Sequence, residues 1–288
     1  MPMKMIDIHT HGIGGFDTIT SSKDAILKIA EIHGRHGVSE IIPAIYSSDI
    51  KTMREHMQAV RDAIENQKST MDGQAQIAGL HLEGPFLNPA QCGALDASSF
   101  LAPDEHAFKE LIDGFEDIVR IITIAPELEG APALIKHISD MGIIVSMGHS
   151  AATYAEAEEG FNTGARGITH LFNAMRGIHH REPGLAGFGL MHNDIYTEVI
   201  ADPFHLNQSI LKLIFSVKIP ERIIIVSDTV KAAHMGKIKS GIRNGSDTLL
   251  GGSMTIQESS ERLINMGIDK DTVCKAVWEN PRKYLQGS

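Results

Sequence analysis

The chain has 288 residues, of which 42% are hydrophobic and 22% are charged, and its formal net charge is -10. This acidic balance argues against a nucleic-acid partner, because phosphate backbones call for clustered Lys and Arg, but it does not exclude a small anionic substrate. Cys92 and Cys274 lie far apart without a disulfide pattern, so we expect a reducing compartment. No window approaches the ~20 apolar residues of a membrane span, and no basic segment followed by an apolar stretch opens the chain. The expected location is the cytoplasm.

Apolar runs and amphipathic helical patterns alternate along the chain. We predict strands at 3–8, 40–45, 76–82, 119–124, 143–148, 167–169, 197–201 and 222–226. Helices are predicted at 22–33, 50–66, 103–112, 131–141, 152–164, 206–217, 255–266 and 271–285, and long loops at 87–103 and 173–184. This alternation predicts one α/β domain over residues 1–288, a (β/α)₈ TIM barrel followed by C-terminal helices. A doubly wound open sheet would need a Gly-rich phosphate turn after the first strand, and His-Thr-His-Gly matches that poorly.

The stretch 143–175 contains two apolar runs that each end in a histidine, His149 and His170. Between them, Thr153 and Glu156 are spaced as a capping box and Gly164 is placed to end a helix. Parallel strands joined by a helix leave their carboxyl ends on one face, where α/β barrels build their sites. Both histidines are therefore candidate ligands of one metal ion.

Other predicted strands end in further candidate ligands. His9 and His11 lie two apart at the end of the first strand, so they share a face, and Glu83 ends the third. Imidazole and carboxylate suit Zn²⁺ or Fe²⁺. Glu83, His149 and His170 would supply three ligands and leave a position open for catalysis, and His9 with His11 would complete a second site. We therefore expect a divalent metal, Zn or Fe, with one or two ions per subunit.

Asp228 follows the eighth predicted strand, and His205 follows the seventh. An isolated Asp after a strand is often a helix cap, but here a metal site needs a base nearby, so we interpret Asp228 as catalytic. The helical histidines away from the strand ends are expected at the surface; these are His33, His36, His56, His106 and His137.

Taken together, the motifs resemble the N-acetylglucosamine-6-phosphate deacetylases of the amidohydrolase superfamily. The matching segments occur in family order and cover nearly the whole chain: IDIHTHG (6–12), HLEGPFLNP (81–89), MGHS (147–150), THLFNAM (169–175), HHREPG (179–184), IADPFH (200–205) and VSDT (226–229). The resemblance implies Glu83, His149 and His170 as ligands of the main metal. It also implies His9 and His11 as the pair that holds a second ion in some members.

The resemblance also implies functions for residues outside the metal ligands. Asp228 is similar to the general base, which passes its proton to the departing amine. His205 resembles a residue that contacts substrate near the scissile carbonyl, and Ala94 a further substrate contact. Asn173 and Ala174 are similar to the backbone donors for the sugar phosphate. Arg181 resembles an arginine that reaches phosphate across the interface of a homodimer, a task that suits its planar fork.

Four features depart from the family pattern. Members carry a small β-sandwich built from both chain ends, and we expect this chain to lack it. Leu95 stands where many members have a histidine, Pro203 replaces a usual glycine, and the loop 231–253 looks short.

The predicted function is metal-dependent hydrolysis of N-acetylglucosamine 6-phosphate to glucosamine 6-phosphate and acetate. Two alternatives remain open. One is a deacylase of another N-acyl amino sugar or of an N-acyl amino acid. The other is a non-catalytic sugar-phosphate-binding protein.

Overall fold

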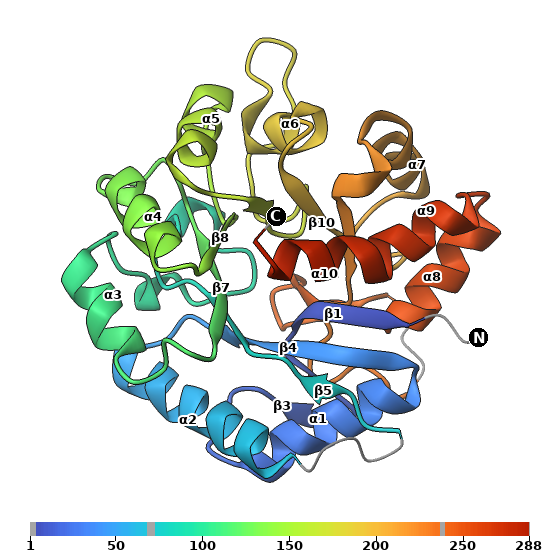
Figure 1. The fold of residues 1–288 in the computed structure, drawn as a ribbon. Coiled ribbons are helices and arrows are strands. Elements are labelled where there is room, and N and C mark those ends of the chain that lie inside the picture. Colours follow the sequence, from blue (N-terminus) through green and yellow to red (C-terminus); the bar gives the residue numbers. More distant parts are fainter. Residues whose placement is uncertain (1–3, 68–72, 237–239, 288) are drawn as a thin grey trace.

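The computed structural model describes residues 4–67, 73–236 and 240–287. Its main sheet runs parallel in chain order, through β1 (Met5–Thr10), β4 (Val38–Tyr46), β6 (Leu80–Glu83), β7 (Val119–Ile124), β8 (Ile144–Met147), β9 (Gly167–Ile168), β10 (Tyr196–Ile200) and β11 (Ile223–Val226). The segment after β11 returns to β1, because Asp228 N donates to His9 O and His11 N donates to Thr229 O, both at 2.8 Å. The (β/α)₈ barrel predicted from the sequence is confirmed, and Figure 1 shows its strands surrounded by helices.

The outer layer consists of α1 (Lys23–Arg35), α2 (Ile50–Asn66), α3 (Glu105–Ile112), α4 (Ala131–Asp140), α5 (Tyr154–Thr163), α6 (Gly184–Met191), α7 (Gln208–Val217) and α8 (Ile256–Asn265). A large apolar cluster lies between the sheet and these helices. The predicted capping box at the start of α5 is present, with Thr153 accepting from Glu156 N and Glu156 accepting from Thr153 N. Among the described residues, no helix is both long and apolar enough to cross a membrane.

The C-terminal helices cover the amino ends of the strands. α9 (Lys270–Cys274) continues through a π-helical turn (Lys275–Glu279) into α10 (Asn280–Leu285). Tyr284 of α10 packs against a second apolar cluster inside the barrel, which includes Ile6, Ile121 and Ile224. Asn280 donates its side-chain amide to the backbone oxygen of Ile223, at the start of β11, at 2.7 Å. The opposite, carboxyl-terminal end is left for the site.

Most predicted boundaries lie within two residues of the observed ones, with informative exceptions. The predicted first strand began at Met3, which lies outside the described residues, and β1 extends to Thr10. The run 76–82 is divided into β5 (Gln76–Ile77), which pairs with β4, and β6. Helix α6 and two hairpins were not predicted; the hairpins are β2 (Gly12–Ile13) with β3 (Phe16–Asp17), and β12 (Ile242–Arg243) with β13 (Leu249–Gly251).

The prediction that His33 and His56 lie at the surface is wrong, because both are buried. His33 continues the buried stripe of α1, which also contains Ile26, Ile29 and Ala30. Those positions follow the helical spacing of a core-facing stripe, so the sequence carried a signal for this burial. His56 lies in the same way on the buried face of α2.

Candidate metal centre

Three of the predicted site residues lie at sharp turns directly after their strands. His149, His170 and Asp228 have φ values of 46°, 30° and 47°, in the left-handed region that side chains with a Cβ rarely adopt. Each such residue costs about 1–3 kcal/mol and persists only where its surroundings fix it. Such strained residues cluster at functional sites. Here they follow β8, β9 and β11, all at the carboxyl end of the barrel strands.

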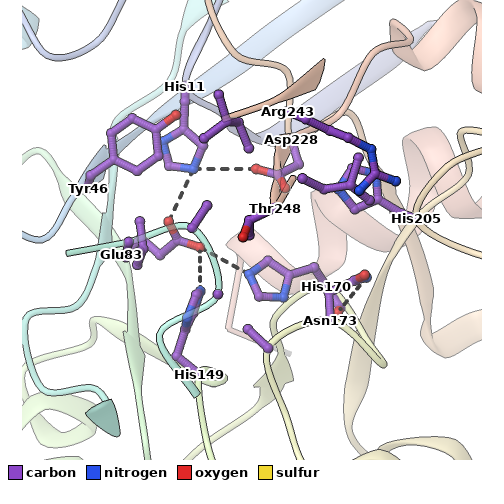
Figure 2. A pocket seen from close by; sticks show the side chains of 17 residues that line it. His11, Tyr46, Glu83, His149, His170, Asn173, His205, Asp228, Arg243 and Thr248 are labelled. Carbon is purple, nitrogen blue, oxygen red and sulfur yellow. Dashed lines mark hydrogen bonds and ion pairs between the residues drawn. The ribbon is translucent and has the colours of Figure 1, made fainter. Parts of the chain in front are cut away.

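Glu83 lies at the centre of the cluster that these strands bring together (Figure 2). Its Oε1 is 3.1 Å from His149 Nε2 and 3.0 Å from His170 Nε2. Its Oε2 is 3.2 Å from His11 Nε2. Histidines up to 87 positions away from Glu83 along the chain therefore aim the same type of nitrogen, Nε2, at its carboxylate.

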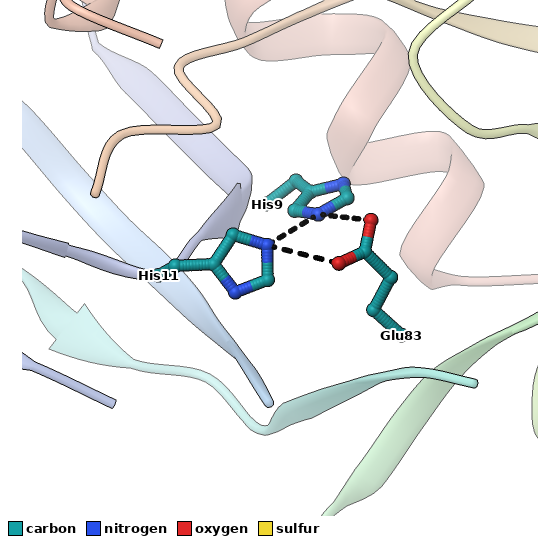
Figure 3. A group of neighbouring side chains, drawn as sticks. All are labelled: His9, His11 and Glu83. Atoms are coloured by element: carbon teal, nitrogen blue, oxygen red, sulfur yellow. Dashed lines mark hydrogen bonds and ion pairs between the residues drawn. The ribbon is translucent and has the colours of Figure 1, made fainter. Parts of the chain in front are cut away.

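His9 and His11 approach the same carboxylate from the end of β1 (Figure 3). The two Nε2 atoms are 3.1 Å apart, and His9 Nε2 is 3.5 Å from Glu83 Oε1. Glu83, His149 and His170 form one group able to hold a metal ion, and His9, His11 and Glu83 form another. Glu83 belongs to both, so it lies where a bridging carboxylate would be.

The outer partners of the histidines favour a cation at the centre. His149 Nδ1 is 3.0 Å from Gln91 O, and His11 Nδ1 is 3.0 Å from Ala44 O. A carbonyl oxygen can only accept, so these contacts assign the proton to Nδ1 and leave Nε2 as an acceptor. Both Nε2 atoms then face carboxylate oxygens, which also only accept. A divalent ion among them resolves that conflict, and nitrogen and oxygen donors of this kind suit Zn²⁺ or Fe²⁺.

The charges at the centre are set by buried partners. Burial raises the pKa of Glu83, but the neighbouring His11 and the contacts with Nε2 of His149 and His170 outweigh burial and hold that pKa well below its ordinary value. Burial lowers the pKa of His9, but the Glu198 carboxylate, 3.0 Å from His9 Nδ1, raises it well above the ordinary value. Glu198 therefore fixes a proton on Nδ1 and directs Nε2 to the centre, the usual arrangement behind a metal-binding histidine.

Asp228 lies at the edge of the cluster, on the cavity side. Its Oδ1 is 3.4 Å from His11 Nε2 and 3.6 Å from His9 Nε2. It is 8% exposed, whereas His9 is fully buried and His11 is 1% exposed. A carboxylate in this position can reach a molecule in the cavity and remains beside the centre.

A cavity of ≈ 270 Å³ opens over the cluster. Four of the five residues predicted to contact substrate line it, namely His205, Asn173, Ala174 and Ala94. His205 Nδ1 is 3.1 Å from Asp202 Oδ1; burial lowers the pKa of His205, but this carboxylate raises it above the ordinary value. A protonated His205 would favour an anionic or carbonyl oxygen in the cavity.

Arg181, the fifth predicted contact, lies elsewhere. It is exposed in the segment before α6, outside the described residues that line the cavity, and its guanidinium is 2.8 Å from His180 Nε2. Within one chain it does not meet the other predicted residues, so a phosphate contact across a dimer stays a prediction.

The structure adds three residues to the site that the sequence did not indicate. Arg243 of β12 lines the cavity. The Tyr46 ring stacks on His11 at 3.8 Å with an interplanar angle of 8°. Glu198 supports His9 from β10. Tyr46 ends the apolar strand β4 and Glu198 interrupts the apolar strand β10, so the alternation of side chains along a strand could have placed both inside the barrel. Arg243 lies in a hairpin for which the sequence predicted no strand or helix.

Comparison with known proteins supports the same assignment of the barrel. Residues 4–266 match the Amidohydrolase family. The chain is 31% identical over 269 residues to N-acetylgalactosamine-6-phosphate deacetylase of Escherichia coli O157:H7, covering 93% of this chain and 68% of that protein. It is 32% identical over 253 residues to N-acetylglucosamine-6-phosphate deacetylase of Bacillus subtilis (strain 168), covering 88% of this chain and 62% of that protein.

A solved structure extends the likeness to the whole barrel. It is a mutant of N-acetyl-D-glucosamine-6-phosphate deacetylase from Mycobacterium smegmatis in complex with N-acetyl-D-glucosamine-6-phosphate. The TM-score is 0.90 at 27% identity, and the match covers 98% of this chain and 77% of that one. The chain spans between 57% and 68% of the lengths of the curated relatives it matches.

Proposed function

Because the chain belongs to the amidohydrolase family, we propose that it is a metal-dependent hydrolase that converts N-acetylglucosamine 6-phosphate to glucosamine 6-phosphate and acetate. The observation that carries the proposal is the meeting of Glu83, His149 and His170 beside Asp228 at the floor of one cavity. The names of the relatives support the choice of substrate. The metal would be held by Glu83, His149 and His170, with His9 and His11 available for a second ion.

The residues fit the needs of amide hydrolysis. The chemistry that a divalent ion supplies when bound at such a site is polarisation of a carbonyl and a water pKa lowered to about 7. Asp228 accepts a proton from the attacking water as the oxygen of that water adds to the acetyl carbonyl carbon. The same carboxyl then donates that proton to the nitrogen as the C–N bond breaks, because an unprotonated amine leaves poorly. The second proton of the water also ends on the nitrogen, so the products are acetate and the ammonium form of the amino sugar, and Asp228 returns to its ionised form.

The polar side of the cavity suits the sugar phosphate. Arg243 and His205 lie together on one side of the cavity in Figure 2, opposite His11 and Tyr46. An arginine and a protonated histidine favour an anion there. Asn173 and Ala174 line the cavity near His170 and are proposed as further substrate contacts, as is Ala94. Arg181 is proposed to reach the phosphate from a second subunit of a homodimer, which light scattering would test.

A second candidate substrate is N-acetylgalactosamine 6-phosphate, which differs in the configuration of one hydroxyl. It is favoured by the match to a deacetylase named for that sugar over 93% of this chain. Parallel assays with both sugar phosphates would separate the two, since the preferred substrate should have the higher kcat/KM.

The experiment that tests the proposal is acetate release from N-acetylglucosamine 6-phosphate by protein stripped of metal and reloaded with Zn²⁺, Fe²⁺ or Co²⁺. We expect turnover only after reloading, and the most active ion would identify the preferred metal. Protein that carries metal but releases no acetate from either sugar phosphate would contradict the proposed activity.

A further inference from the structure

A second hollow adjoins the catalytic cavity. Its volume is ≈ 330 Å³, and it shares Tyr46, Ala94, Leu95 and Leu250 with the cavity over the metal centre. We call this second hollow the annex. Because four side chains line both spaces, the annex lies directly against the site.

The remaining walls of the annex are mainly apolar. In addition to the shared residues, it is lined by four apolar residues, Ile19, Val230, Ala232 and Ile242, and by four polar ones, Asp17, Ser47, Asp96 and Lys231. Such a surface favours a hydrocarbon group over a sugar or a phosphate, because burying an unpaired hydroxyl or charge there would be unfavourable.

The polar side chains of the annex already have partners. Asp17 accepts a hydrogen bond from Ile19 N at 3.0 Å and lies 3.7 Å from the Lys231 ammonium. Ser47 is hydrogen-bonded to Ser99, at 2.9 Å between the hydroxyl oxygens. Asp96 accepts hydrogen bonds from Ser98 N at 3.0 Å and from Ser98 Oγ at 2.7 Å. The annex therefore presents few groups that a polar ligand would need.

The annex meets the site beside the reacting centre. Tyr46, which lines both spaces, stacks directly on His11, and His11 Nε2 is 3.2 Å from Glu83 and 3.4 Å from Asp228. One aromatic ring thus separates the annex from the cluster where the amide carbonyl would lie. The substituent nearest to that carbonyl carbon, apart from the amine, is the acyl chain.

The other end of the substrate is directed away from the annex. In Figure 2, Tyr46 and His11 lie on one side of the cluster, and Arg243 and His205 lie on the other. Two successive residues of β12 face different spaces: Ile242 lines the annex, and Arg243 lines the cavity. With the phosphate on the Arg243 side, the acyl chain extends toward Tyr46 and Leu95.

We propose that the annex receives the acyl chain, so that the substrate class includes N-acyl amino sugar phosphates with acyl groups longer than acetyl. This inference rests on the proposed deacylase activity and extends it. The reaction is unchanged. Water adds to the carbonyl carbon, the C–N bond breaks, the amine takes both protons of the water, and the longer acyl chain leaves as its carboxylate.

The test is a chain-length series of N-acetyl, N-propionyl and N-butyryl glucosamine 6-phosphate, with kcat/KM measured on metal-loaded protein. Dissociation constants are measured in parallel by calorimetry on the Asp228→Asn variant, which should turn the compounds over about 10²–10⁴-fold more slowly. We expect affinity to rise about fourfold per added methylene, and thus about fifteenfold for butyryl, as expected for burial of each CH₂. The butyryl compound should be hydrolysed with a kcat/KM at least equal to that of the acetyl compound.

Two variants narrow the annex at residues that do not line the cavity. Ala232→Trp narrows it from one side, and Ile19→Trp does so from a position that is 51% exposed and therefore tolerant of a larger side chain. In both, the ratio of butyryl to acetyl kcat/KM should fall at least tenfold. The matched control is Ala155→Trp, at an exposed alanine on α5 outside both spaces, which should keep the ratio of the parent protein.

The outcomes separate this proposal from the proposed function. Acetyl hydrolysis with no gain in affinity or turnover for propionyl and butyryl would overturn the annex proposal and leave the proposed function standing. Hydrolysis of the butyryl compound alone, with that activity lost in Ala232→Trp, would support the annex and contradict the acetyl substrate. A butyryl preference that persists in both filled variants would also overturn the annex proposal.

Discussion

Two groups of buried histidines in this barrel have opposite environments. At the carboxyl ends of the strands, His11 and His149 are held by backbone carbonyls and aim Nε2 at the Glu83 carboxylate. Below and beside them, His33 and His81 are equally buried, but their Nε2 atoms contact hydroxyls, His33 to Thr10 at 3.0 Å and His81 to Thr123 at 2.8 Å.

The electrostatics of the second group are those of neutral, structural residues. Burial lowers the pKa of His33 to about 3, assisted by the nearby His36 and His234. Burial and the adjacent His9 lower the pKa of His81 well below its ordinary value. A hydroxyl can donate or accept, so Nε2 of each ring has a partner in either tautomer without an ion, whereas Nδ1 of each ring has no hydrogen-bond partner among the described residues. The partner of Nε2, rather than burial, therefore separates His11 and His149 from His33 and His81.

The largest effect is expected from Glu83→Gln, which keeps the shape of the residue at the centre of the first group and removes its charge. The two groups of possible metal ligands beside the cavity both use this carboxylate, whereas a third group, His9, His81 and Glu198, does not. Metal affinity should fall by more than the about 100-fold reached at outer-shell positions, and acetate release should become undetectable. Metal analysis by mass spectrometry checks this, with circular dichroism as a control for folding. Stoichiometric metal in this variant would show that Glu83 is not a ligand.

Asp228→Asn should reduce kcat strongly while the metal stays bound. It removes the proposed proton carrier but keeps its size, so kcat should fall by about 10²–10⁴-fold, the contribution of general acid–base catalysis. Steady-state kinetics at saturating metal, together with metal content, separates this from Glu83→Gln. A variant that keeps its metal and most of its turnover would exclude Asp228 as the base.

Glu198→Gln tests the support behind His9. The amide can no longer hold the proton on His9 Nδ1 by charge, so affinity for the ion beside His9 and His11 should weaken by about 10–100-fold. Competition with a metal chelator measures the change. Glu129→Gln, at an exposed glutamate, is the matched control and should bind metal as the parent protein does. Equal affinities in both variants would contradict the role assigned to Glu198.

The smallest effect on activity is expected from His33→Leu, in the second group. Metal content and kcat should stay within about twofold, while the free energy of unfolding at pH 7 falls by about 0.5–1.5 kcal/mol because the Thr10 hydroxyl loses one of its two hydrogen-bond partners and keeps Thr229. Chemical denaturation provides that measurement. Loss of metal from this variant would place His33 in the first group and break the distinction.

The parent protein and the His33→Leu variant should also differ in how their free energies of unfolding depend on pH. The pKa of His33 is about 3 when folded and ordinary when unfolded, so the unfolded chain binds more protons between about pH 3 and 6.5. The parent protein therefore loses the contribution of His33 as pH falls through that range, and the leucine variant has none to lose. The stability difference between them should shrink on acidification; a constant difference would contradict a neutral, buried His33.

Much of the barrel could be predicted because its signals are local. The capping box of Thr153 and Glu156 and the apolar runs ending at His149 and His170 fixed the repeating unit without knowledge of the fold. Helix α6 escaped prediction because Gly184–Met191 is apolar on every side, and its burial among neighbours replaces the amphipathic pattern.

The parts of the site that could not be predicted depend on contacts between distant segments. Glu198 meets His9 across 189 positions, and no spacing rule links them. Arg243 enters the cavity from a short hairpin whose strands pair only with each other. Arg181, by contrast, had a motif in the sequence but lies away from the cavity of its own chain. A motif identifies a residue, whereas only the packed fold gives its neighbours.

Crystals of zinc-loaded protein would test the central claim most directly through anomalous scattering at the zinc edge. We predict an ion within about 2.0–2.2 Å of a Glu83 oxygen and of the Nε2 atoms of His149 and His170. An anomalous peak elsewhere in the molecule, with these three side chains free of metal, would contradict the account.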